Sequence, residues 1–246
     1  MESMEIIEVV SGLSLLRFPV GQAYIWRDDD GLTLVDAGTA GAGALIADAV
    51  VSLGHSPRDV RRIVLTHFHE DHAGGAGELA ALTGAEVLAH ERDAPFVRGV
   101  AEGPPPLFEE WEKPLYAQVS KLLPDPSVPL VRPAAVTGVA DGDVLGFGGG
   151  ARVVSVPGHT EGSIGIHLPE HGVLFTGDAV AAMPGDGRVL MGVFNQDRAG
   201  TETSFARLAA LDTEVACFGH GDPVRRNAGK VLREAYARDH RAAGTD

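Results

Sequence analysis

The chain has 246 residues, a length that suits one αβ domain or two small ones. Hydrophobic residues make up 44% of it, which is enough for a sizeable core and too many for a disordered chain. Lysine and arginine number 20 against 34 aspartates and glutamates, so the net charge is −14. This negative balance opposes nucleic-acid binding, which needs a basic footprint, and it opposes docking on an anionic membrane.

The sequence shows no sign of export or membrane insertion. The acidic segment Met1–Val10 lacks the basic start and long apolar run of a signal peptide. No stretch approaches the roughly 20 apolar residues of a membrane span. The single cysteine, Cys217, cannot form an internal disulfide, and we interpret it as a buried strand residue. We therefore expect a cytoplasmic protein.

Apolar patterns and turn residues predict alternating strands and helices in the first half of the chain. In chain order, the predicted elements are short strands within 5–18 and 21–35, a helix over 43–53, a buried strand over 62–66, a helix over 73–82 and a strand over 85–89. Gly54 and Gly84 are expected to end the two helices, because glycine is common just after a helix C-terminus.

Strands return from residue 136 onward. The predicted elements are strands over 152–156, 163–168 and 172–176, a loop over 179–200, a helix over 202–211, a strand over 214–218 and a helix over 223–240. Strands and helices alternate, so the predicted fold class is α/β or α+β with mixed sheets. We expect a single domain over residues 1–246.

Residues 99–135 differ from the rest of the chain. This segment holds a run of three prolines and the aromatic residues Phe108, Trp111 and Tyr116, and a short helix is predicted near 107–122. It is too long for an ordinary connection, and such insertions are often lids or binding loops. Its aromatic side chains can either line a substrate pocket or lie in a homodimer interface. Both places suit aromatic side chains, which have a large apolar surface and, in tryptophan and tyrosine, a polar group at one end.

Several metal-ligating residues follow the strand predicted over 62–66. The sequence His67-Phe68-His69-Glu70-Asp71-His72 contains three imidazoles and a candidate carboxylate ligand. Alternation in an extended chain puts His67 and His69 on one side, Asp71 continues that side, and His72 turns at the helix entry. Imidazole and carboxylate are ligands of zinc, iron and manganese. The pattern favours a metal site over a polar surface loop.

These residues resemble the HxHxDH signature of the metallo-β-lactamase superfamily. The later motifs of that superfamily have counterparts in the right order at Pro157–Ser163, Thr176–Asp178 and Gly219–Pro223. The resemblance implies a four-layer αββα sandwich with two metal ions at one edge, between the two sheets. It implies zinc, or else manganese or iron, as the metal.

The resemblance also implies a role for each ligand. It assigns the first metal to His67, His69 and His159, the second metal to Asp71, His72 and His220, and the bridging position to Asp178. Two cations lower the pKa of a shared water, so that hydroxide is available near neutral pH to attack a carbonyl. The resemblance further implies a catalytic role for Asp71, which would orient that hydroxide or pass its proton to the leaving group.

Other residues have two interpretations each. Asp36 could end a strand and cap a turn, or it could brace a metal-binding histidine as its family counterpart does. The strand Gly31–Asp36 resembles Gly172–Asp178, since each is predicted to be buried and to end in an aspartate. The 179–200 segment follows Asp178 directly, so its residues Met183 and Phe194 are candidate pocket residues together with Trp111.

None of the remaining histidines is interpreted as a direct metal ligand. His90 and His167 lie beside predicted strands and could be core residues or supports for a ligand. The others, His55, His171 and His240, lie beside turns or on a polar helix and are expected at the surface.

The predicted function is hydrolysis of an ester, thioester, lactone or related bond in a small molecule. The chain most resembles the small glyoxalase-II-like members, although residues 221–246 are too few for the C-terminal helical domain of glyoxalase II. Residues 179–183 lack the tyrosine that acyl-homoserine lactonases carry there. Asp178 stands where zinc β-lactamases carry a cysteine. The alternatives are β-lactam hydrolysis and an iron-dependent oxidoreductase similar to persulfide dioxygenases.

Overall fold

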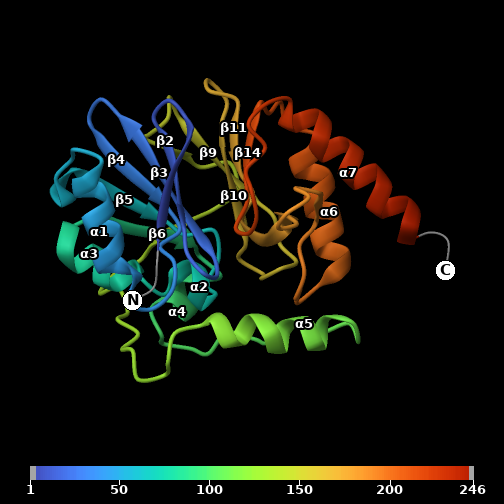
Figure 1. Cartoon of the computed structure of the whole chain (residues 1–246), viewed down its shortest axis with the longest axis horizontal. Coiled ribbons are helices and arrows are strands. Elements are labelled where there is room, and N and C mark those ends of the chain that lie inside the picture. The colour runs from blue at the N-terminus through green and yellow to red at the C-terminus, as the bar shows by residue number, and fades with distance from the viewer. Residues whose placement is uncertain (1–3, 244–246) are drawn as a thin grey trace. The chain divides into compact units, whose positions relative to one another are not determined.

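The computed structural model describes residues 4–243. The first three residues of the Met1–Val10 segment, in which we expect no signal peptide, lie outside this range. The chain divides into two compact units (Figure 1). Unit 1 comprises Met1–Gly103 and Lys113–Val139, and unit 2 comprises Pro104–Glu112 and Ala140–Asp246. The single domain expected over 1–246 stays a prediction.

Unit 1 contains a seven-stranded sheet whose strands are hydrogen-bonded in sequence order. Its strands are β1 (Glu5–Val10), β2 (Leu13–Arg17), β3 (Gln22–Asp28), β4 (Gly31–Val35), β5 (Val60–Val64), β6 (Glu86–His90) and β7 (Thr137–Val139). The strands from β1 to β4 are antiparallel, and those from β4 to β7 are parallel. The parallel strands therefore direct their carboxyl ends, and the segments that follow them, to the same edge of the sheet.

Four helices of unit 1 bury apolar residues with the sheet in one core: α1 (Ala42–Ser52), α2 (Glu70–Ala73), α3 (Ala76–Thr83) and α4 (Ala94–Val97). Unit 1 also contains η1 (Pro57–Asp59), most of α5 (Glu112–Val119) and η2 (Ser120–Leu122), which add no residue to this core. Ile46 of α1, Leu79 of α3 and Ile63 of β5 have no exposed surface in this core. Gly43 allows α1 and α3 to approach closely, because a Cβ there would lie 2.6 Å from the backbone nitrogen of Leu79.

The helix predicted over 73–82 is wrong in its first turn. The chain forms the short helix α2, bends at Gly74 and Gly75, and starts α3 at Ala76. The carbonyl of His72 accepts a hydrogen bond from the nitrogen of Ala37 at 2.7 Å, and Gly75 donates to Gly38 at 3.1 Å. These bonds to residues 37–38 replace those of a continuous helix.

Unit 2 contains a five-stranded sheet in the order β14-β11-β10-β9-β8 and a separate hairpin, β12-β13. Its elements are β8 (Val144–Leu145), β9 (Ala151–Ser155), β10 (Ile164–Leu168), β11 (Val173–Phe175), η3 (Gly177–Ala179), β12 (Val180–Ala182), β13 (Val189–Met191), α6 (Arg198–Ala209), β14 (Val215–Cys217) and α7 (Ala228–Ala243). Within the described part of unit 2, β11 and β14 pair in parallel, and the other strand pairs are antiparallel. The two helices share one core with these strands, including Phe205, Leu208 and Leu232.

Three further predictions of secondary structure need correction. The segment 179–200 is not a loop throughout, because it holds the β12-β13 hairpin and the start of α6. Helix α6 begins at Arg198, where Asp197 caps it by accepting from the nitrogen of Gly200 at 3.1 Å. Helix α7 begins at Ala228 rather than 223, since Val224 first pairs with Ala216.

The helix predicted over 107–122 starts only at Glu112. Residues before it are held in non-helical conformation, with the nitrogen of Leu107 donating to the carbonyl of Asn195 at 2.9 Å. The short strands β7 and β8 were not predicted. With these corrections, the predicted mixed α/β class is confirmed.

Candidate metal centre

Unit 1 brings its four candidate ligands together at the end of β5. The connection after β5 carries His67 and His69, and α2 carries Asp71 and His72; we call these four residues the unit 1 cluster. The ring centroid of His67 lies 4.7 Å from that of His69 and 4.2 Å from that of His72. Nε2 of His72 lies 3.5 Å from Oδ2 of Asp71. These four side chains, which are close in the sequence, therefore also lie close together in space.

A buried hydrogen-bond network orients this cluster. Asp36 follows β4, and its Oδ1 accepts from the nitrogen of Thr66 at 2.7 Å. Its Oδ2 accepts from the Thr66 hydroxyl at 2.9 Å and lies 3.0 Å from Nδ1 of His72. The same hydroxyl lies 3.0 Å from Nδ1 of His67. Asp36 thus follows a strand and contacts the candidate ligand His72, and its role in bracing that ligand stays a prediction.

The network fixes which nitrogen of each ring carries the proton. A hydroxyl has one hydrogen, and Thr66 gives its hydrogen to Asp36, so the Thr66 oxygen accepts from Nδ1 of His67. A carboxylate only accepts, so Nδ1 of His72 is also a donor. In the neutral rings, Nε2 then carries the lone pair, which is the form of histidine that binds a metal.

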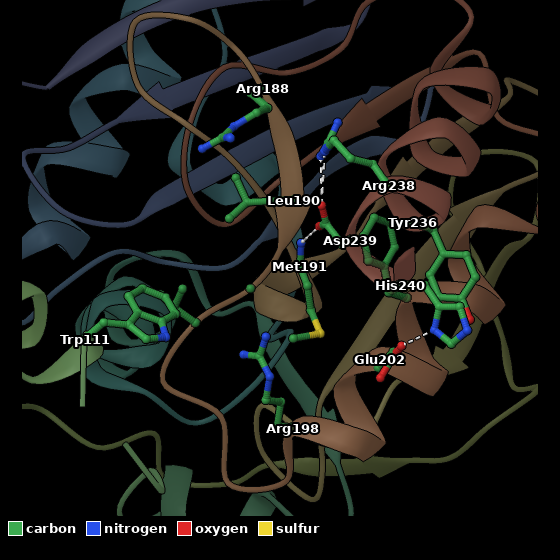
Figure 2. Close-up of a pocket in the computed structure, with 13 residues that line it drawn as sticks. Trp111, Arg188, Leu190, Met191, Arg198, Glu202, Tyr236, Arg238, Asp239 and His240 are labelled. Atoms are coloured by element: carbon green, nitrogen blue, oxygen red, sulfur yellow. Dashed lines mark hydrogen bonds and ion pairs between the residues drawn. The ribbon is translucent and has the colours of Figure 1, made fainter. Parts of the chain in front are cut away.

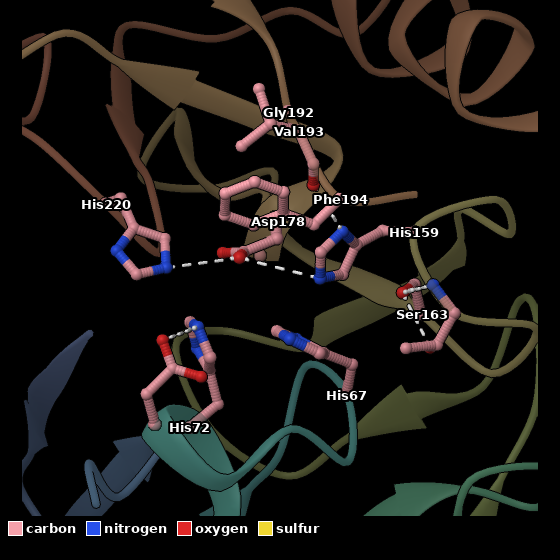
Figure 3. A network of polar contacts seen from close by, with 12 residues as sticks. His67, His72, His159, Ser163, Asp178, Gly192, Val193, Phe194 and His220 are labelled. Atoms are coloured by element: carbon pink, nitrogen blue, oxygen red, sulfur yellow. Dashed lines mark hydrogen bonds and ion pairs between the residues drawn. The ribbon is translucent and has the colours of Figure 1, made fainter. Parts of the chain in front are cut away.

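Unit 2 brings together its own three candidate ligands, His159, Asp178 and His220, which we call the unit 2 cluster. Asp178 lies in η3 directly after β11, and His220 follows the neighbouring strand β14. Oδ2 of Asp178 lies 3.6 Å from Nε2 of His159 and 3.2 Å from Nε2 of His220 (Figure 3). Nδ1 of His159 donates to the carbonyl of Val193 at 3.1 Å, so here too Nε2 is the nitrogen that carries the lone pair.

Residues 192–196 contact the unit 2 cluster, since the carbonyl of Val193 accepts a hydrogen bond from His159. Two residues that form hydrogen bonds with the backbone of this segment were not predicted from the sequence. Glu112 is buried, and its carboxylate accepts from the nitrogen of Glu109 at 2.9 Å and from that of Phe194 at 3.1 Å. Asn195 is also buried, and it donates to the carbonyl of Gly192 at 2.8 Å. No local pattern around Glu112 signals this role, because its partner Phe194 is 82 positions away.

A cavity of about 380 Å³ opens in unit 2 (Figure 2). Of the three residues predicted to line a pocket, Trp111 lines this one. Met183 is 39% exposed, and the Phe194 ring packs 6.0 Å from the Phe108 ring; neither lines the cavity. The cavity is bounded by Val193, whose carbonyl accepts from His159.

The other singled-out residues lie outside both clusters. His90 and His167 are buried, and His167 bonds to the carbonyl of Asp212 at 3.1 Å. His171 and His240 are exposed as expected, whereas His55 is partly buried. Cys217 is buried in β14, as predicted, and burial raises the pKa of its thiol far above the usual value.

The residues that could supply ligands to a metal ion are therefore His67, His69, Asp71 and His72 in unit 1 and His159, Asp178 and His220 in unit 2. Each group combines imidazoles with a carboxylate, which is a donor set that suits zinc, manganese or iron. Among residues 4–243, no helix is both long and apolar enough to cross a membrane.

Comparison with known protein families gives one match over most of the chain. The model of the metallo-β-lactamase superfamily matches residues 16–220. A probable metallo-hydrolase of Bacillus subtilis, YflN, is 28% identical over 232 residues, which are 88% of this chain and 86% of that protein. The hydroxyacylglutathione hydrolase of Halorhodospira halophila is 32% identical over 90% of this chain and 74% of its own length. The enzyme of the same name from Cereibacter sphaeroides is 34% identical, but the match spans only 48% of its length.

Solved structures match the fold over nearly the whole chain. A metallo-β-lactamase family protein from Thermus thermophilus has a TM-score of 0.68 and 28% identity, covering 96% of this chain and 81% of that one. A subclass B3 metallo-β-lactamase from a soil metagenome library has a TM-score of 0.67, with 95% of this chain and 93% of that one covered. Its identity is 22%, so this second likeness shows the fold alone.

Proposed function

The chain belongs to the metallo-β-lactamase superfamily and is a metal-dependent hydrolase, and we propose that it uses two metal ions to cleave a small-molecule ester, thioester or lactone. The observation that carries this proposal is the state of three histidines. His67, His72 and His159 each donate from Nδ1 to an oxygen, which leaves the lone pair of Nε2 for a metal.

The proposed ligand sets follow the family. His67, His69 and His159 would hold one ion, Asp71, His72 and His220 would hold the other, and Asp178 would be shared by both. The ligands of the first ion would include three neutral imidazoles, whereas those of the second would include two imidazoles and the carboxylate of Asp71. Zinc is the expected metal, with manganese or iron as alternatives.

The bound ions would supply a water of lowered pKa and would polarise the carbonyl of the substrate. The chain's own residues do the positioning. Asp36 and Thr66 fix the rings of His72 and His67, and the carbonyl of Val193 fixes the ring of His159. Asp71 is partly exposed, so we assign its carboxylate the orientation of the attacking water and the uptake of its proton.

The proposed bond class rests on the relatives. Several of them are named hydroxyacylglutathione hydrolases. In three of these relatives, the part that matches this chain makes up between 48% and 74% of the relative's length. We carry over the cleavage of an activated acyl bond and leave the rest of the molecule that bears it open. A cytoplasmic location, a homodimer and a specificity role for residues 99–135 stay predictions.

Removal of the metal tests this proposal. We expect that dialysis against a chelator abolishes hydrolysis of a panel of esters, thioesters, lactones and β-lactams, and that zinc or manganese restores it. The restored rate should track the metal content, measured by elemental analysis on the same samples. Full activity in protein verified to be metal-free would refute the proposal.

A further inference from the structure

The cavity in unit 2 combines apolar walls with charged side chains. Residues of the β12-β13 hairpin, of α6 and of α7 line it, together with Trp111. Its volume of about 380 Å³ falls in the range of small-molecule sites. Figure 2 shows Arg188 and Arg198 on either side of Met191 in this cavity.

Several of the polar side chains in the cavity already contact one another. Arg238 pairs with Asp239 at 3.1 Å, and the carboxylate of Asp239 also accepts from the nitrogen of Met191 at 3.1 Å. Glu202 pairs with the ring of His240, which stacks on Tyr236 with the ring centroids 5.6 Å apart. These contacts leave two cationic groups, Arg188 and Arg198, to be accounted for.

The guanidinium groups of Arg188 and Arg198 have no ion pair or hydrogen bond with any residue in the described range 4–243. Only the backbone nitrogen of Arg188 is engaged, by Asp186 at 2.9 Å. Two uncompensated positive charges in one cavity contrast with the net charge of −14 of the whole chain. A guanidinium presents a planar fork of donors that matches a carboxylate or a phosphate.

The apolar walls define the other part of a ligand. Trp111 is 54% exposed although it lines the cavity, and Leu190, Met191 and Val193 line it as well. An exposed indole beside aliphatic side chains favours a flat or extended apolar group. Val193 also accepts the hydrogen bond from His159, so a molecule in this cavity would lie next to a segment that orients a proposed metal ligand.

We propose that this cavity binds an organic anion, with its carboxylate or phosphate at Arg188 and Arg198 and its apolar part against Trp111 and Met191. The description of this anion as part of the substrate rests on the proposed function. Its binding does not, because none of the cavity residues is a proposed metal ligand. The substrate class is thus an acyl compound that bears a negative charge remote from the bond that is cleaved.

A matched pair of probes tests the binding. Naphthalene-2-carboxylate and naphthalene-2-carboxamide have the same ring system and differ in charge. Of the two tryptophans, Trp26 is buried and Trp111 is exposed in the cavity, so quenching of tryptophan fluorescence reports on this site. In metal-loaded protein we expect the carboxylate to bind about tenfold more tightly than the amide. We expect that difference to disappear in the double variant R188Q/R198Q.

The double variant R58Q/R226Q is the control. Both of these arginines are exposed and lie outside the cavity, and their replacement removes the same amount of charge. The control should keep the preference for the carboxylate. Equal binding of the two probes by the unmodified protein would overturn the inference. A preference that persists in R188Q/R198Q but vanishes on chelation would overturn it too, because the anion would then bind the metal ions.

A kinetic comparison of two esters tests whether the cavity contributes to substrate binding. The p-nitrophenyl monoester of adipic acid carries a free carboxylate, and p-nitrophenyl hexanoate lacks it. In R188Q/R198Q the KM for the adipate should rise about tenfold while kcat and the hexanoate parameters change little. If R188Q/R198Q loses binding of the carboxylate probe but keeps its kinetics, the substrate role of the cavity is overturned. If the unmodified protein binds the probe but hydrolyses neither ester, the proposed function is contradicted and the anion site is not. Metal content and thermal unfolding of each variant show that the fold is retained.

Discussion

Oδ2 of Asp36 lies 3.0 Å from Nδ1 of His72, and the same oxygen accepts the hydroxyl hydrogen of Thr66. Asp36 is 3% exposed, and its backbone has a φ of 61°, a conformation that is uncommon for a residue with a side chain. One buried carboxylate therefore fixes His72 directly and fixes His67 through Thr66. The network ties the end of β4 to the cluster that follows β5.

Replacing Asp36 with asparagine should weaken metal binding without removing a ligand. The amide is neutral and nearly isosteric, so His72 loses its charged acceptor. We expect the affinity for metal to fall about 10- to 100-fold, the range found when such outer partners are lost. Competition with a chromophoric chelator measures this change. Asp48→Asn, an exposed change on α1, should have no effect, and an equal loss in both variants would contradict the assigned role.

Gly21 allows the chain to pass close to Asp71. It has a φ of 69°, and a Cβ there would lie 2.2 Å from the carbonyl oxygen of Asp71. Gly21→Ala should therefore displace Asp71 and reduce the metal content. Gly54→Ala is a matched control, because Gly54 has a φ of 87° and faces open space. The control should cost about 1 kcal/mol of backbone strain and keep the metal; full metal retention in Gly21→Ala would rule out this contact as a constraint.

Glu112 should contribute to stability through its two buried hydrogen bonds. In Glu112→Gln one side-chain oxygen remains, so one of the two backbone nitrogens, of Glu109 or Phe194, loses its acceptor. We expect a loss of about 1–3 kcal/mol in the free energy of unfolding, measured by urea denaturation. Glu109→Gln, at an exposed position, should change it by less than about 0.5 kcal/mol. A stability equal to that of the unmodified protein would show that water replaces these bonds.

Cys217 should be unreactive in the folded protein. It is 1% exposed, and burial raises the pKa of its thiol, so very little thiolate forms near pH 8. A disulfide reagent such as Ellman's should therefore label the native chain far more slowly than a free thiol. Unfolding in urea should restore rapid labelling of one thiol per chain. Rapid labelling of the native chain, with unchanged circular dichroism, would contradict this expectation.

The proximity of the candidate ligands in unit 1 could be predicted because their signal is local. The spacing of His67, His69, Asp71 and His72 follows from an extended chain entering a helix, and the structure brings these side chains together. The similarity between Gly31–Asp36 and Gly172–Asp178 also has a structural counterpart. β4 and β11 each pair in parallel with the strand that precedes a histidine-bearing segment, β5 in unit 1 and β14 in unit 2.

The support around these ligands could not be predicted from local patterns. Glu112 lies in a proline-rich, largely exposed segment, and its buried state depends on residues 192–196, which are distant in the sequence. The β12-β13 hairpin was missed because strands of three residues are too short for a hydrophobic period to appear. The anion cavity depends on both, since Trp111 precedes Glu112 and Arg188 precedes β13.

The proposal of a two-metal hydrolase is tested most directly by comparing Asp178→Ala with the unmodified chain. The measurements are the metal content, the rate of hydrolysis and the requirement for oxygen. A carboxylate shared by two cations reduces their mutual repulsion, so the variant should lose mainly the second ion and retain the first on His67, His69 and His159. We expect about two ions per chain in the unmodified protein and about one in the variant. We also expect hydrolysis by the variant to fall by several orders of magnitude, and hydrolysis by the unmodified protein to need no oxygen. A single iron per unmodified chain, with turnover only in the presence of oxygen, would contradict it.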